Sequence, residues 1–307
     1  MLEAWNPEAQ PCGGLPPAIR GKLTRRSSLG LLLTLGACAS QAGVPGDMQA
    51  WNRPFPPYRV LDDIYYVGTN KIAQFLIATS AGLILIDSGF EASVPQLREN
   101  IATLGFQYSD IKLLLTSHAH IDHVQAHAVV RRQTGARVVA SALDAPLIER
   151  GGKGDPLYDG VYAWTPCPVD WRVRDQEAVT LGSTILTAHL TPGHTLGALT
   201  WTMQATDGGR TLDVVFFPSA NVNPGVRLLG RPNYPGIVQD FERSFAIWKS
   251  LKCDVFLADH GDFYDMSEKY ARLRGGAKPN PFIDPNGYRK FLADAEERFR
   301  ARLAEER

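Results

Sequence analysis

Three histidines and one aspartate fall within six positions of the sequence, at His118, His120, Asp122 and His123. They come directly after residues 111–116, an apolar run that predicts a buried strand. If the chain stays extended beyond that strand, His118 and His120 project to the same side, whereas Asp122 and His123 turn toward a second point. Histidine and carboxylate side chains are ordinary zinc ligands, so the segment predicts a site for two metal ions rather than one.

Two further histidines are candidates for the same site. His194 lies in a tight turn after one apolar run, and His260 closely follows another. Each imidazole is therefore expected at the end of a strand, where a side chain can point into a cleft. His189 alternates within its predicted strand and His127 falls on the helix after the cluster, so we assign both to structural roles.

The order of the apolar runs predicts an α/β domain. Strands are expected at residues 64–67, 75–78, 83–86, 111–116, 137–140, 185–190, 198–202, 214–217 and 255–258, and helices at 93–104, 124–132, 142–148, 238–251, 267–273 and 287–304. Strand, helix and strand alternate around the cluster, which puts its side chains where open α/β sheets place their sites. Asp87 ends one predicted strand, and two roles stay open for it: orienting a ligand imidazole or capping the turn.

Residues 151–171 lose the periodicity of the flanking segments and gather glycine, proline and aromatic residues. A loop of this length within a compact domain is usually functional. We expect it to form a rim over the site, with Tyr162 and Trp164 offering apolar contact to a substrate. Simple packing on the surface of the domain is the alternative role.

The first 37 residues predict an export signal. Arg25 and Arg26 precede a largely apolar stretch at residues 29–37, which is too short to span a bilayer as a helix. The arginine pair is typical of a twin-arginine signal, and the residues before Cys38 are typical of a lipoprotein processing box that would lipidate this cysteine. A soluble product, cut within residues 37–44, is the alternative. Both alternatives place the mature protein in the periplasm.

Composition and charge limit what the rest of the chain can be. The 307 residues are 44% apolar, enough for a large core, and lysine plus arginine balance aspartate plus glutamate at 32 each. This balance gives no sign of a nucleic-acid partner. We expect an extended segment at residues 38–56, one catalytic domain at residues 57–307, and a monomer. Cys167 and Cys253 remain after the leader, either as a disulfide or as free thiols.

The metal-type residues and their neighbours resemble a known family. They resemble the metallo-β-lactamase superfamily, and in particular its subclass B3. The resemblance is carried by residues 118–123, 192–195 and 259–261, by Ser219 and Asn221, and by the tail at residues 280–289. It implies an αββα sandwich: two sheets face each other, helices cover both outer faces, and the site lies along one edge.

The resemblance also implies a role for each candidate residue. It implies a first zinc ion bound by His118, His120 and His194, and a second bound by Asp122, His123 and His260. Each of these sets leaves room for water, as a catalytic zinc site requires. Ser219 and Asn221 match positions that, in the family, contact the substrate carboxylate or the metal-bound water.

Charge favours β-lactams over the other substrates of this superfamily. Glyoxalase-like and lactonase-like relatives have a metal-bridging aspartate at the strand end where this chain has Ser219. Without that carboxylate the site is more positive, which suits a small-molecule substrate with a carboxylate of its own. We predict hydrolysis of penicillins, cephalosporins and carbapenems by a metal-bound hydroxide that attacks the lactam carbonyl. Asp122 would orient the hydroxide as well as bind metal.

Two features depart from the family pattern, and two competing functions remain. Gln125 and Ala126 stand where most members have small glycines, so the amide of Gln125 is expected to crowd the second metal or to hydrogen-bond near the substrate. Asp259 is expected to point outward into solvent. The competing functions are a hydrolase of the same fold that acts on lactones, thioesters or phosphoesters, and a non-catalytic zinc-binding envelope lipoprotein.

Overall fold

Alternate residues of the central strands face two different hydrophobic clusters, so this sheet is buried on both faces. In β4 (Gly82–Ile86), Ile84 and Ile86 belong to one cluster, whereas Leu83 and Leu85 belong to the other. The strand β5 (Ile111–Leu115) alternates in the same way. A strand with two buried faces needs a covering layer on each side.

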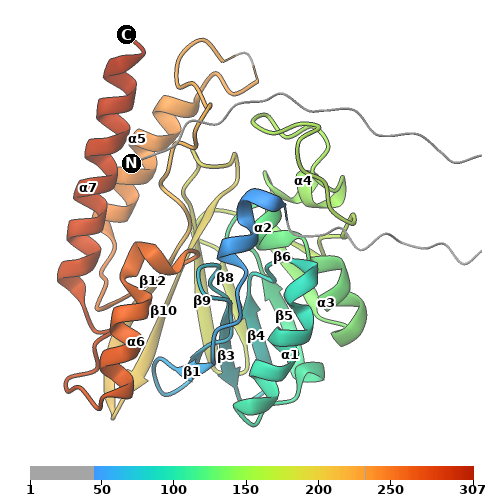
Figure 1. Cartoon of the computed structure of the whole chain (residues 1–307), viewed down its shortest axis with the longest axis vertical. Helices are drawn as coiled ribbons and strands as arrows, with labels where there is room; N and C mark the ends of the chain where they lie inside the picture. Colours follow the sequence, from blue (N-terminus) through green and yellow to red (C-terminus); the bar gives the residue numbers. More distant parts are fainter. Residues whose placement is uncertain (1–44, 232) are drawn as a thin grey trace, which may run out of the picture. The chain divides into compact units, whose positions relative to one another are not determined.

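The computed structural model describes residues 45–231 and 233–307, and all of them belong to one compact unit (Figure 1). The predicted export signal at residues 1–37 and the predicted lipidation site Cys38 lie outside the described residues. The domain boundary at residue 57 stays a prediction, and residues 45–56 belong to the same compact unit as the residues after it.

The strands of the described residues form two sheets. The first has the order β1-β2-β3-β4-β5-β6-β7, which comprises Tyr58–Arg59, Ile64–Tyr66, Phe75–Thr79, Gly82–Ile86, Ile111–Leu115, Arg137–Ser141 and Trp171–Val173. The second has the order β12-β11-β10-β9-β8, which comprises Val255–Ala258, Arg210–Phe217, Leu199–Asp207, Thr184–Leu190 and Ala178–Leu181. The apolar runs predict all of these strands except the short β1, β7 and β8.

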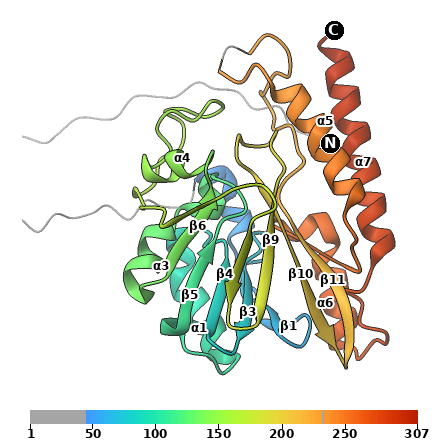
Figure 2. The same cartoon turned by 180° about the vertical axis from the view of Figure 1, so that it is seen from behind.

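Helices cover the outer faces of the two sheets (Figures 1 and 2). The helices on the side of the first sheet are α1 (Val94–Thr103), α2 (Ile121–Val124), α3 (His127–Thr134) and α4 (Ala145–Glu149). The second sheet is covered by α5 (Ile237–Ser250) and α7 (Pro285–Glu305), while α6 (Met266–Arg274) packs near β1 through Tyr270 and Tyr58. The predicted αββα sandwich is confirmed. Within the described ranges, every helix is too short or too polar to cross a bilayer.

Two local predictions were wrong. Within the segment that we expected to be extended, Gly46–Trp51 forms a 3-10 helix. The predicted helix at residues 124–132 is interrupted, because the backbone N–H of Ala126 donates to the carbonyl of Gly89 (3.1 Å) in the loop after β4. This bond separates the single turn of α2 from α3 and ties both to the end of β4.

Cys167 and Cys253 are both free thiols, which decides between the two alternatives left by the sequence. Burial raises the pKa of Cys167 to about 11 and raises the pKa of Cys253 further above its ordinary value. Neither cysteine is therefore a reactive thiolate at neutral pH.

The loops that carry the candidate site leave the sandwich at one edge. β4, β5 and β6 run parallel to one another, so Asp87, the cluster after β5 and Asp144 follow their carboxyl ends together. In the second sheet, β11 and β12 are parallel and β9 runs in the same direction, which brings His194 and His260 to the carboxyl ends of that sheet. Site residues from both sheets therefore meet at a shared edge.

The indole of Trp201 gives a test of how the two sheets support this edge. It is fully buried and donates from Nε1 to the carbonyl of Thr116 (3.0 Å), directly before the histidine cluster. We expect Trp201→Phe to lower the free energy of unfolding by about 1–3 kcal/mol, because that buried carbonyl loses its donor. Urea unfolding measures this loss.

Trp248→Phe is the matched control for ring size. Its indole donates to the hydroxyl of Thr200 (2.7 Å), which keeps a second partner in Thr191 (2.9 Å). The loss for Trp201→Phe should therefore exceed the loss for Trp248→Phe. The reverse order would contradict the role given to the Trp201 bond.

Candidate metal centre

Asp87 holds the loop that carries the histidine cluster. Its Oδ1 accepts a hydrogen bond from the backbone N–H of Ser117 (2.8 Å), and its Oδ2 accepts one from the Ser117 hydroxyl (2.6 Å). The same Oδ2 lies 3.2 Å from Nδ1 of His123. Asp87 adopts a left-handed backbone with φ of 58°, a conformation that a non-glycine residue keeps only when its surroundings stabilise it. Of the two roles left open by the sequence, the contact with His123 favours the orienting one.

Three ligand-type atoms from Asp122, His123 and His260 converge on one point. Nε2 of His123 lies 3.3 Å from Oδ2 of Asp122 and 3.3 Å from Nε2 of His260, and these last two atoms are 3.5 Å apart. Atoms that bind one tetrahedral zinc ion at about 2.0–2.2 Å are themselves about 3.3–3.6 Å apart. The group has the spacing of a ligand set. We call it the second triad.

His118, His120 and His194 form the first triad. One ligand atom from each lies within 4.8 Å of the others, and their rings are 4.6–4.8 Å apart between centroids. Nδ1 of His194 donates to the backbone carbonyl of Asn221 (2.8 Å), which leaves Nε2 for a metal. Nδ1 of His118 faces the hydroxyl of Ser117 (3.1 Å), which likewise leaves Nε2 for a metal.

The burial and the protonation state of the ligand imidazoles are those expected of metal ligands. Nε2 of His118 and Nε2 of His120 are buried with no hydrogen-bond partner among the described residues. Burial lowers the pKa of both imidazoles well below its ordinary value, and it lowers the pKa of His194 and of His260 to about 4. These four side chains are therefore neutral at pH 7 and have a free lone pair. The two triads together can hold divalent metal ions.

Asp122 and His123 are coupled through their charges. Burial alone would raise the pKa of Asp122, but the nearby imidazole of His123 holds it well below its ordinary value. Burial would lower the pKa of His123, but Asp122, and then Asp87, raise it well above the ordinary value. A carboxylate that stays ionised is a good metal ligand, and a metal ion in the second triad would replace the proton on His123.

Asp144 joins the loops of the first triad, a role that no local sequence signal predicts. Its Oδ2 accepts hydrogen bonds from the backbone N–H of Ala119 (2.9 Å) and from the hydroxyl of Thr195 (2.7 Å). Its Oδ1 accepts one from the backbone N–H of Gly197 (2.8 Å). Ala119 lies between two ligand histidines and Thr195 follows the third, so a single carboxylate fixes their separation.

Asp259 does not point into solvent, so that prediction was wrong. Its side chain is 1% exposed, and Oδ2 lies 3.4 Å from Nδ1 of His118 and 3.8 Å from Nε2 of His123. The chain direction at the end of β12 decides this, because His260 faces the cavity and the preceding residue faces the interior between the sheets. Burial raises the pKa of Asp259 to about 8.

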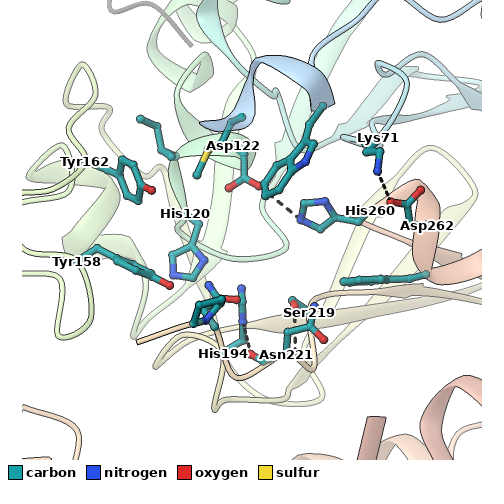
Figure 3. Close-up of a pocket in the computed structure, with 16 residues that line it drawn as sticks. Lys71, His120, Asp122, Tyr158, Tyr162, His194, Ser219, Asn221, His260 and Asp262 are labelled. Carbon is teal, nitrogen blue, oxygen red and sulfur yellow. Dashed lines mark hydrogen bonds and ion pairs between the residues drawn. The ribbon is translucent and has the colours of Figure 1, made fainter. Parts of the chain in front are cut away.

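A cavity of about 520 Å³ opens above the two triads, and a drug-sized ligand needs a volume of this order. Figure 3 shows His120, His194, Asp122 and His260 around its base. Of the predicted substrate contacts, Ser219, Asn221 and Tyr162 line the cavity. Trp164 does not, which corrects its predicted role: it is only 6% exposed and packs in the hydrophobic cluster behind the loop.

Several lining residues were not among the sequence-predicted site residues. They are Met48, Trp51, Lys71, Ile121, Tyr158, Asn223, Pro224, Asp262 and Phe263. Met48 and Trp51 come from the 3-10 helix in the segment expected to be extended, and Trp51 packs edge-on against His260 at 5.7 Å. The bridge between Ile72 and His260 brings this segment and Lys71 to the site. Such pairings between distant segments leave no local pattern.

The remaining polar residues around the cluster have structural roles. His127 is bonded to the hydroxyls of Ser88 (2.7 Å) and Thr116 (2.9 Å), and His189 is bonded to Gln176 and Thr202 outside the cavity. Both assignments from the sequence agree with this geometry. The side chain of Gln125 accepts from the backbone N–H of Glu91 (3.0 Å) and does not line the cavity, so the predicted crowding of the second metal was wrong.

Comparison with known proteins places this fold and site in one family. The family model of the metallo-β-lactamase superfamily matches residues 68–205. The FEZ-1 metallo-β-lactamase from Legionella gormanii is 41% identical, with a TM-score of 0.82, over 83% of this chain and 98% of that chain. BJP-1, a subclass B3 metallo-β-lactamase of Bradyrhizobium japonicum, is 42% identical, with a TM-score of 0.79, over 84% of this chain and 97% of that chain.

The chain belongs to the metallo-β-lactamase superfamily. The predicted membership, the resemblance to subclass B3 and the predicted enzyme class are confirmed. A curated protein, the hydroxyacylglutathione hydrolase of Methylobacterium sp. (strain 4-46), is 32% identical over 108 residues. That alignment covers about a third of each protein, 35% of this chain and 35% of the relative.

The lowered pKa values of the ligand histidines predict how the metal-free protein responds to acid. In the unfolded chain His194 and His260 bind protons below pH of about 6.5, whereas in the folded protein they do so only near pH 4. The unfolded state therefore binds more protons between these values, and stability should fall as the pH falls from about 6.5 to about 4. Each histidine contributes a slope of at most about 1.4 kcal/mol per pH unit.

Urea unfolding with a chelator present, at several pH values, measures this slope. His194→Gln and His260→Gln should each make it shallower, because each removes one titrating group. Subtracting the variant curve from the wild-type curve cancels the contribution of titrating groups that do not interact with the replaced histidine. Equal slopes in all three proteins would contradict the lowered pKa values.

Proposed function

We propose that this protein is a β-lactamase that uses two zinc ions to hydrolyse the cyclic amide of β-lactam antibiotics. The observation that carries this proposal is the pair of triads, set side by side at the base of one cavity. Each triad has three ligands and so leaves a coordination position for water or substrate, as a catalytic zinc site does. The similarity to enzymes that are themselves named metallo-β-lactamases supports the choice of substrate.

The metal ions and Asp122 have complementary tasks. Zinc bound at the triads would polarise a carbonyl and lower the pKa of water to near neutrality. The carboxylate of Asp122 stays ionised at neutral pH, so it can accept a hydrogen bond from the attacking water and hold it toward the substrate. The chain around these residues keeps them in place before substrate arrives, which avoids reorganisation during the reaction.

The walls of the cavity give substrate both apolar and polar contacts. Trp51, Phe263 and Tyr158 offer ring surfaces that exclude water around a bound ring system. Ser219 and Asn221 lie together below His260 in Figure 3, where they can donate hydrogen bonds to a substrate carboxylate. We therefore assign them to substrate binding.

A hydrolase of thioesters or other esters is the second candidate. The partial similarity to a hydroxyacylglutathione hydrolase favours it, and so does the buried carboxylate of Asp259, which returns one acidic group to the neighbourhood of the metals. Ser219 at the end of β11 favours the lactam instead, because no carboxylate stands there. A chelator-reversible assay with a chromogenic cephalosporin, beside a thioester, separates the two. Bound zinc without turnover of either would support a non-catalytic binding protein.

We further propose that the protein works in the periplasm as a monomer. The support for the location is the leader-like sequence before residue 38, which lies outside the described residues. Lipidation at Cys38 and release as a soluble protein are both consistent with this location.

Replacement of Asp122 tests the reaction. Asp122→Ala removes one ligand of the second triad and the acceptor for water, so we expect kcat/KM for a cephalosporin to fall by about 100-fold or more. Metal content should fall as well. Asp110→Ala, which removes an exposed carboxylate far from the triads, is the control and should keep wild-type activity. Substantial turnover by Asp122→Ala would remove this residue from the mechanism.

Lys71 is the only lysine or arginine among the described residues that line the cavity. Its Nζ lies 2.7 Å from Oδ2 of Asp262 on the far side of His260 (Figure 3). An ammonium has three donors, so this bond leaves two for the carboxylate of a substrate. We expect Lys71→Gln to raise KM by about 10-fold with little change in kcat.

The methyl ester of the same lactam gives the matched comparison. It lacks the negative charge, so wild type and Lys71→Gln should have similar KM values for the ester. An equal increase in KM for acid and ester would mean that Lys71 acts on the shape of the cavity and not on charge.

A further inference from the structure

Asp259 is a buried carboxylate that has no task in the mechanism described above. Its side chain is 1% exposed. Neither of its oxygens has a hydrogen bond of ordinary geometry among the described residues. Burying a carboxylate without a hydrogen-bond donor costs free energy, so we expect a donor among the groups around Asp259.

The backbone of Asp259 is fixed by both sheets. Its N–H donates to the carbonyl of Phe217 (3.0 Å) at the end of β11, and its carbonyl accepts from the N–H of Ala73 (2.8 Å) near β3. The side chain is therefore not free to swing outward. It is held between the sheets, directly behind the two triads.

The carboxylate faces two imidazoles, of which one is already committed. Nε2 of His123, at 3.8 Å, belongs to the second triad. Nδ1 of His118, at 3.4 Å, points away from the first triad and carries the proton of the neutral ring if Nε2 binds metal. The group available to Asp259 is thus the Nδ1–H of His118.

Two of the other ligand rings show the same arrangement. His194 donates from Nδ1 to the carbonyl of Asn221, and Nδ1 of His123 faces the carboxylate of Asp87. Among the described residues, Nδ1 of His118 also lies 3.1 Å from the Ser117 hydroxyl, which donates its own proton to Asp87. Two acceptors therefore compete for one proton, and one of them is a carboxylate.

We propose that Asp259 is a positioning residue whose carboxylate accepts the Nδ1 proton of His118 and fixes that imidazole for the metal of the first triad. The assignment of metal to the triads rests on the proposed function. A carboxylate behind a ligand imidazole sets the tautomer and the ring orientation and makes the metal-bound nitrogen more basic. The two residues after β12 would then serve both triads. His260 is a ligand of the second triad, and Asp259 positions His118 of the first.

Zinc affinity is the direct test. We expect Asp259→Ala to weaken zinc binding at the first triad by about 10–100-fold, the usual effect of removing such a partner. Competition with a chromophoric chelator measures the affinity in the full protein and in an Asp122→Ala background, which removes a ligand of the second triad. Asp259→Asn should lose less, because its amide oxygen can still accept the proton.

Matched variants separate positioning from other roles. Asp110→Ala, which removes an exposed carboxylate before β5, is the control and should change zinc affinity by less than about twofold. If Ser117→Ala causes the whole loss and Asp259→Ala causes none, the proposal is overturned. A purely structural role predicts that Asp259→Ala destabilises the metal-free protein. Our proposal predicts that urea unfolding of the metal-free variant shows no such loss, because removing the buried carboxyl group also removes the cost of burying it.

Spectroscopy of the metal-bound protein excludes the alternative that Asp259 is itself a ligand. With cobalt in place of zinc, positioning predicts the same ligand-field spectrum in wild type and Asp259→Asn, whereas loss of a ligand would change it and overturn the proposal. The His118 Nδ1–H proton signal should move upfield in Asp259→Asn. These readouts do not depend on turnover, so a protein that shows them but leaves β-lactams intact would refute only the proposed function.

Discussion

Imidazoles buried at the edge shared by two sheets are the constraint on which the rest of this structure depends. A buried ring has two nitrogens, and each needs a partner. In His118, His123 and His194 the protein provides one partner, a hydroxyl, a carboxylate or a backbone carbonyl, and leaves the other nitrogen to converge on its neighbours. The left-handed turn at Asp87 and the three hydrogen bonds of Asp144 are best understood as the scaffolding of this arrangement.

Much of the fold could be predicted from the sequence because its signals are local. The apolar runs identify the central strands, and the density of ligand-type residues after β5 identifies the site. The assignment of His194 and His260 to particular triads came from the resemblance to a family, since residues so far apart in the chain give no local indication of their contact. The geometry of both triads agrees with that assignment.

The failures have a common physical cause. Trp164 lies in an aromatic loop like Tyr162, but packing behind the loop, which sequence does not show, separates a core ring from a cavity ring. Asp259 was placed in solvent because a charged residue is usually exposed. The cavity walls formed by Gly46–Trp51 and Phe263 were missed because they depend on pairings between distant segments. The bridge between Ile72 and His260 joins residues nearly two hundred positions apart.

Each triad draws its ligands from both sheets. His118 and His120 follow the first sheet and His194 follows the second, while Asp122 and His123 are matched by His260 in the same way. Bound cations would thus connect the two sheets of the sandwich. A shift of one half by a fraction of an ångström would open both coordination sets at once. Substitutions in the core between the two sheets can therefore change metal binding, even where they lie far from any ligand.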